Sequence, residues 1–239
     1  MKQKINSNKK ETITTKEIET LYKISQTITS NFYLKDILDL IVVTTAELMG
    51  SKICSIMLLD ETKQELKIVA TQSLSEEYRN KPNIKVGQSI SGKAVKEKRP
   101  ITILDVTKEP DYMYPKIAEK EGLRSMLSVP MMIKDKVIGV INSYTSKKYK
   151  FTEKEIKMLK VIANQAAIAI ENAKLLEETL SYKEALETRK LIEKAKGILM
   201  EKNNLTEEEA YQTIRKKSMD SRKSMKEIAE AIILTSDMP

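Results

Sequence analysis

The feature that most constrains the fold is a long stretch without helix breakers. From Thr152 to Lys196 the chain contains neither glycine nor proline, and Thr152 with Glu155 forms a capping-box pattern where the stretch begins. Apolar residues then recur at alternating steps of three and four: Ile156, Leu159, Ala163, Ala166, Ile170 and Ala173. This spacing predicts one long amphipathic helix in the second half of the chain, with separate structures before and after it.

The apolar spacing of this helix continues as a second run: Ala166, Ala169, Ala173, Leu176 and Leu180. It fits either a helix packed on a sheet of its own domain or a parallel coiled coil between two copies of the chain. Beyond Leu180 the pattern gives way to charged residues. We predict a homodimer whose seam contains Ile170, Ala173, Leu176 and Leu180, with residues 176–190 as a helical linker or coiled coil.

The region before the long helix changes from helical to strand periodicity. Two helices are predicted first, over Thr15–Thr29 and Leu34–Met49, with Gly50 ending the second. Strands are then predicted at Ile53–Leu59, Leu66–Ala70, Ile101–Leu104, Ser125–Ile133 and Val137–Tyr144, with a turn at residues 134–136. Adjacent hairpins with helices at the chain ends predict an α+β domain, in which helices cover an antiparallel sheet.

The region after residue 190 predicts three short helices that share a small core. A buried stripe is predicted on the first: Leu191, Ile192, Ala195, Ile198 and Leu199. The second begins at the capping box of Thr206 and Glu209, with an inward side of Ala210, Tyr211, Ile214 and Ser218. The third begins at Ser224 with Glu227 and buries Met225, Ile228, Ala229 and Ile232. The carboxy-terminal module is therefore predicted to be all-α.

One face of the first short helix is unusual. At about 100° per residue, Lys196, Gly197 and Met200 lie opposite the buried stripe. Glycine inside a helix costs about 1 kcal/mol relative to alanine, and a domain core needs neither residue there. A solvated face is the ordinary explanation. Because Arg215 and Met219 line up on the next helix, we favour a binding surface.

These residues also carry a family resemblance. Ala-Lys-Gly-x-x-Met at 195–200, Ala-Tyr at 210–211 and Arg-x-x-Ser-Met at 215–219 resemble the ANTAR domain, although Ser218 and Ile214 replace the commoner alanine and leucine. The resemblance implies an RNA-binding module of transcription antitermination regulators whose targets are two successive stem-loops. We predict these RNA-binding residues: Lys196, Gly197, Met200, Arg215, Lys216, Met219 and Lys223.

The larger domain resembles a GAF domain. The likeness rests on the runs Val86–Ala94, Pro100–Asp105, Leu123–Met131 and Val137–Asn142. It implies a sensory module with a small-molecule pocket on one face of the sheet, and leaves the ligand and its binding residues unknown. Cyclic nucleotides fit poorly, since Asn142 is followed by serine rather than lysine. A bilin fits poorly because the single cysteine, Cys54, lies outside the expected part of the pattern.

Composition argues against catalysis. The chain has no histidine and one cysteine, which excludes histidine-based catalytic triads, a resolving thiol and the usual zinc sites. Cys54 lies in an apolar run and is predicted to be a buried small hydrophobe. The run Gly87–Ala94 nearly matches a phosphate-binding P-loop, but Ala94 replaces the hydroxyl that would bind magnesium. We predict no catalytic residue, no metal site, no cofactor beyond the unknown GAF ligand and no enzymatic activity.

The formal net charge of +8 suits a polyanionic partner without identifying one. The expected domains are a disordered basic tail (1–14), the GAF domain (15–175), the linker (176–190) and the ANTAR domain (185–239). No apolar run approaches a membrane span, so a cytoplasmic location is expected. Together these features predict a signal-responsive RNA-binding antiterminator. The alternative is a GAF-containing DNA-binding regulator that uses the last helices as a helix-turn-helix.

Overall fold

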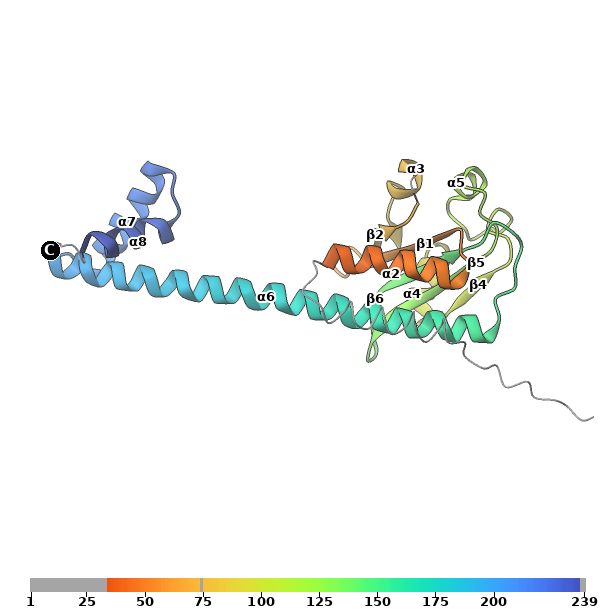
Figure 1. The fold of residues 1–239 in the computed structure, drawn as a ribbon. Helices are drawn as coiled ribbons and strands as arrows, with labels where there is room; N and C mark the ends of the chain where they lie inside the picture. Colours follow the sequence, from red (N-terminus) through yellow and green to blue (C-terminus); the bar gives the residue numbers. More distant parts are fainter. Residues whose placement is uncertain (1–33, 74, 237–239) are drawn as a thin grey trace, which may run out of the picture. The chain divides into compact units, whose positions relative to one another are not determined.

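The computed structural model describes residues 34–73 and 75–236, and the chain divides into two compact units, residues 1–173 and 174–239 (Figure 1). The expected basic tail and the expected helix over Thr15–Thr29 lie outside the described residues. Each unit has its own hydrophobic core, and each is considered separately below.

The first unit is built on one antiparallel sheet. Its strands are β1 (Ile53–Asp60), β2 (Glu65–Thr71), β3 (Ile84–Lys85), β4 (Ile101–Ile103), β5 (Met126–Ile133) and β6 (Lys136–Tyr144). They lie in the order β3-β2-β1-β6-β5-β4, and every neighbouring pair is antiparallel. The predicted strands and both predicted hairpins are confirmed, and Lys134 takes the left-handed conformation in the turn between β5 and β6.

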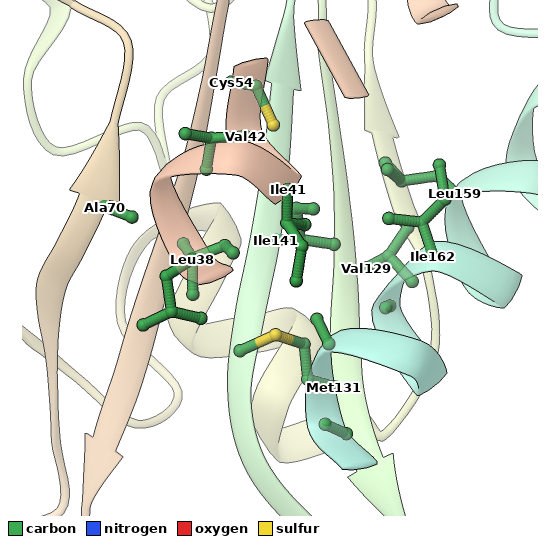
Figure 2. Packing of buried hydrophobic residues seen from close by; sticks show 14 of the residues in the cluster. Leu38, Ile41, Val42, Cys54, Ala70, Val129, Met131, Ile141, Leu159 and Ile162 are labelled. Atoms are coloured by element: carbon green, nitrogen blue, oxygen red, sulfur yellow. The ribbon is translucent and has the colours of Figure 1, made fainter. Parts of the chain in front are cut away.

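Helix α2 (Leu34–Met49) and the first part of α6 (Glu153–Asn203) cover one face of this sheet. Figure 2 shows Ile41 of α2 and Leu159 of α6 directed toward Val129 and Ile141 on the strands. Burying each such side chain contributes roughly 1.5–3 kcal/mol. Cys54 lies in this core with no exposed surface, and burial raises the pKa of its thiol, so the predicted role as a small hydrophobe is consistent with its position.

Helices α3 (Glu76–Arg79), α4 (Ser89–Glu97) and α5 (Pro115–Lys120) contribute to the core on the opposite face. This core contains a cluster of tyrosines. The Tyr144 ring packs edge-on against Tyr78 and Tyr112, with centroids 6.2 and 6.5 Å apart, and the Tyr78 hydroxyl lies 3.1 Å from Ser55 Oγ. The sequence analysis did not predict these helices, because four to nine residues are too few to establish a helical period.

The long helix is confirmed as α6, which spans 51 residues. The predicted capping box is formed, since Thr152 N donates to Glu155 Oε2 and Glu155 N donates to Thr152 Oγ1. The first part of its apolar spacing serves the sheet rather than a second chain, because Ile170 is 6% exposed and belongs to the core of the first unit. Its place in the predicted dimer seam is therefore corrected: packing on the sheet already buries this side chain.

The second unit contains the end of α6, α7 (Glu207–Ser221) and α8 (Met225–Ser236). Most of its predicted core is confirmed, with Ala195, Ala210, Ile214 and Ala229 fully buried, but Tyr211 and Ile198 are not part of it. Both predicted capping boxes are present, at Thr206 with Glu209 and at Ser224 with Glu227, and these hydrogen bonds hold the pKa of each glutamate below its ordinary value.

Candidate nucleic-acid interface

Gly197 is the most distinctive position of the second unit. It is exposed near the end of α6, and a Cβ built on it meets no atom within 4 Å. The helix therefore does not need glycine for packing, although glycine costs about 1 kcal/mol there relative to alanine. Met200, on the same side of α6, is 39% exposed. The structure thus leaves a smooth, partly apolar surface at these two positions.

Lys196 differs from the expectation. The helical wheel placed it on the open face, but it is 7% exposed, with Nζ 3.0 Å from Glu193 Oε2 and 2.6 Å from Glu207 Oε1. These hydrogen bonds, first that with Glu207, raise the pKa of Lys196, and the same bond lowers the pKa of Glu207. The helical spacing of α6 takes no account of neighbouring helices, and Glu207, the first residue of α7, covers the Lys196 side chain. Two carboxylates therefore offset the Lys196 charge, and its contact with RNA stays a prediction.

The other cations of the predicted RNA-binding set are exposed to solvent. Arg215 and Lys216 on α7 are exposed, as is Lys223 in the turn before α8, and none of the three has an ion pair in the part of the chain that the structure describes. Met219, which follows Arg215 by one helical turn, is 62% exposed. Exposed guanidinium and ammonium groups and an exposed thioether can contact phosphates and the faces of bases.

Tyr211 was placed on the inward side of its helix, and this prediction is wrong. The side chain is 37% exposed and lies one turn before Arg215, so Tyr211, Arg215 and Met219 form a stripe along α7. Around the helix axis, Tyr211 lies roughly 60° from the buried Ile214, at the edge of the buried face. Helical spacing alone does not tell whether a residue at this edge is buried or exposed. An exposed tyrosine beside an arginine is the side-chain pair on which unstacked RNA bases stack.

Ser218 explains how the turn that carries Lys223 is held. Its hydroxyl donates to the Lys223 carbonyl oxygen at 2.6 Å, while Lys223 N donates back to the Ser218 carbonyl oxygen at 3.2 Å. Arg222 between them takes the left-handed conformation, with φ of 56°. Ser218, an atypical residue in the predicted motif, therefore fixes the path of the backbone between α7 and α8.

The motif that nearly matches a P-loop has a packing role. A Cβ on Gly92 would lie 2.3 Å from the Lys85 carbonyl oxygen, so this glycine lets α4 approach β3 closely. Ser91 Oγ donates to Asn142 Oδ1 at 3.1 Å, and the Lys93 ammonium pairs with Asp111. These contacts account for the residues that resembled a phosphate-binding loop.

Exposed apolar residues also lie along the middle of α6. Leu176 and Leu180 of the predicted seam are 59% and 53% exposed, and Ala173 is partly buried. A second line was missed by the sequence analysis: Ile168, Leu175 and Tyr182 recur every seven residues and are 46%, 52% and 75% exposed. Seven-residue spacing is typical of a coiled-coil seam, so this helix offers two overlapping stripes rather than one.

Comparison with known proteins agrees with this division into a sheet domain and a small helical module. The GAF domain profile matches residues 34–171 and the ANTAR domain profile matches residues 181–233. The chain belongs to the GAF family and carries an ANTAR domain after its GAF domain. No helix in the described ranges is both long and apolar enough to cross a bilayer.

Two curated relatives match the carboxy-terminal part. The transcriptional regulatory protein PdtaR of Mycobacterium tuberculosis is 44% identical over 62 residues, which are 26% of this chain and 30% of PdtaR. The nitrate regulatory protein of Klebsiella oxytoca is 53% identical over 53 residues, 22% of this chain and 13% of that protein. The chain therefore spans less than a third of either relative. Both relatives are named as regulatory proteins.

The first unit resembles a solved GAF domain. That of the Acinetobacter phosphoenolpyruvate-protein phosphotransferase superposes with a TM-score of 0.59 at 25% identity, over 70% of this chain and 99% of that one. A structure of free methionine-R-sulfoxide reductase from Neisseria meningitidis has a TM-score of 0.58 at 19% identity over 67% of this chain and 91% of its own, which shows a shared fold alone.

Proposed function

We propose that this regulator binds RNA through its ANTAR domain and prevents transcription termination by holding two successive stem-loops of a leader transcript. The observation that carries the proposal is the surface around Gly197. A helical glycine that its own domain does not require lies on the face of α6 that also exposes Met200. The exposed cations Arg215, Lys216 and Lys223 belong to the same small unit. Together they suit close backbone approach and contact with loop bases.

DNA binding is the competing function, and α8 argues against it. A helix-turn-helix reads the major groove with polar side chains at the start of its recognition helix. At the start of α8, Met225 packs against the core and the Glu227 carboxylate accepts hydrogen bonds from Ser224. Only Lys226 remains free for base contacts at this helix end.

The test is a filter-binding titration of the full-length protein against a two-hairpin leader transcript, with duplex DNA of the same sequence and a scrambled single-stranded RNA as controls. Preferential binding to the two-hairpin RNA by an order of magnitude or more supports the proposal. Equal or tighter binding to duplex DNA would favour the helix-turn-helix alternative.

Two copies of the chain would supply two RNA-binding modules. We propose a homodimer formed along α6, because binding at one stem-loop then makes binding at the second intramolecular and increases avidity. The exposed stripe at Leu175 and Tyr182 and the adjacent Leu176 and Leu180 are the candidate seams. Leu176→Glu with Leu180→Glu should reduce affinity for a two-hairpin RNA and leave affinity for one hairpin unchanged.

The proposed role of the GAF domain is to sense a small molecule and to bias that dimer. A ligand needs only a few kcal/mol of differential affinity to shift such an equilibrium. Cytoplasmic action and the absence of catalysis are part of the same proposal, in which a nascent leader transcript would be the target.

A further inference from the structure

A buried lysine on the tyrosine-rich face of the GAF domain pairs with no carboxylate of the described residues. Lys81 follows α3 and is 8% exposed, with Nζ 4.1 Å from the centroid of the Tyr78 ring and 5.7 Å from that of Tyr114. Within residues 34–73 and 75–236 no carboxylate pairs with it. Aromatic rings attract an ammonium group, but they replace only part of the hydration that burial removes. The fold therefore holds a cation whose charge is poorly compensated.

Lys81 lines a cleft of about 420 Å³ whose walls are basic. The lining residues are Lys67, Ile68, Arg79, Asn80, Lys81, Pro82 and Asn83. They provide three cations and two amides, and no carboxylate is among them. The volume is that of a site for a small molecule, and the donors suit an oxyanion.

The walls of the cleft are held in place by hydrogen bonds that leave these donors available. Tyr114 Oη donates to the Pro82 carbonyl oxygen at 2.9 Å, which fixes the chain directly after Lys81. Arg79 uses only Nε, in a bond to the Ser73 carbonyl oxygen at 2.6 Å. Asn83 donates to Glu65 at 3.2 Å, and this glutamate does not line the cleft.

We propose that this cleft binds a small organic anion, with its carboxylate or phosphate group on Lys81 and the neighbouring Arg79 and Lys67. Such a ligand would supply the missing counterion. The binding of the anion to the cleft is independent of the proposed function. Only its role as the signal that the GAF domain senses rests on that function.

Protonation of Lys81 gives the site a pH signature. Burial lowers the pKa of Lys81 to about 7. The titratable groups that face it are the tyrosines Tyr78 and Tyr114, whose pKa values are raised by burial, and the cations Lys67 and Arg79 in the cleft. Relative to Lys81→Met at the same pH, anion binding should therefore be tighter at pH 6 than at pH 8, because Lys81 is mostly protonated at the lower pH.

The alternative is that Lys81 stabilises the fold and binds no ligand. One substitution distinguishes these two roles. Methionine keeps an unbranched side chain that is shorter by one atom, and removes the charge. If Lys81 exists to bind a ligand, Lys81→Met should raise the thermal midpoint of the ligand-free protein, because an uncompensated buried charge is removed. If Lys81 supports the fold, the same change should lower that midpoint.

The experiment uses the full-length protein with inorganic phosphate and malonate as probes, measured by calorimetric titration at pH 6 and pH 8. We expect saturable binding of at least one probe to the wild type, weakened by about tenfold or more in Lys81→Met. Phosphate binding alone would indicate a phosphorylated ligand, and malonate binding alone a carboxylate. Lys160→Met, an exposed lysine on α6, is the matched control and should bind like the wild type.

Three outcomes would overturn the proposal: no binding of either probe, unchanged binding in Lys81→Met, or a lowered thermal midpoint in that variant. If Lys81→Met fails to fold, the double variant Arg79→Met with Lys67→Met tests the same cleft through exposed residues. Two-hairpin RNA binding is measured in parallel without probe, and Lys81→Met should retain it. If the wild type does not bind the two-hairpin RNA, the proposed function is refuted, whereas the anion-binding proposal is still tested by the probe titrations.

Discussion

Gly197 gives the sharpest test of the RNA-binding face, because one substitution should change stability and binding in opposite directions. A Cβ at this position has open space around it, and the residue lies within α6 rather than at its end. Gly197→Ala should therefore stabilise the module by about 1 kcal/mol through helix propensity alone. Gly197→Leu should stabilise it nearly as much, since leucine is also a good helix former.

RNA binding should respond in the other direction. If a loop backbone or base packs against Gly197, four additional carbon atoms must be accommodated in a closely packed contact. Overpacking of this kind costs about 1–3 kcal/mol, which corresponds to roughly a 5- to 150-fold loss of affinity. Gly197→Ala should give a smaller loss, so affinity should fall with side-chain size while stability does not.

The measurements are urea unfolding followed by far-UV circular dichroism and filter binding to the two-hairpin transcript. Ala231→Leu is the matched control, because Ala231 is exposed on α8 and lies outside the proposed face. Normal RNA binding by Gly197→Leu would refute the assignment of this face. Destabilisation by Gly197→Ala would show instead that the glycine is needed for folding.

Four further outcomes are expected. Arg215→Ala should reduce the slope of log affinity against log salt by about 0.7 if the loop behaves as a single strand, measured by filter binding. Leu175→Glu with Tyr182→Glu should convert a dimer to a monomer in light scattering if the second stripe forms the seam. Between pH 7 and pH 9, the unfolding free energy of the wild type should rise by roughly 2 kcal/mol relative to Lys81→Met, because the unfolded lysine binds the proton that the folded one releases; a parallel pair of urea-derived curves would contradict this. No ATP hydrolysis is expected from the purified protein, and hydrolysis that Lys93→Ala abolishes would overturn the proposed absence of catalysis.

The sequence predicted those features that depend on local patterns. These are the strands with alternating apolar residues, the capping boxes and the long helix without glycine before Gly197. Each depends on residues close together in the sequence, and each lies in the structure where the sequence predicted it. Most of the core of the second unit followed from the apolar spacing of its three helices for the same reason.

The predictions that failed depended on which elements pack together. Lys196 is covered because α7 begins beside it, and Ile170 is buried because α6 packs on the sheet. Periodicity identifies an apolar or polar side of a helix but not the partner that covers it. Lys81 gave no signal at all, since a lysine in a polar run before proline is ordinarily an exposed loop residue. Only the tyrosines brought over it by the fold explain its burial.

Gly197 and Lys81 share a property that separates them from ordinary packing positions. Each carries a local cost that its own domain recovers only in part: a helical glycine with empty space around it, and a buried ammonium group that no carboxylate of the described residues pairs with. Natural proteins keep such costs mainly where a partner compensates them. Each should therefore yield a variant that is more stable alone and weaker in binding. A structural residue cannot give that combination, because its replacement removes contacts that the free protein uses.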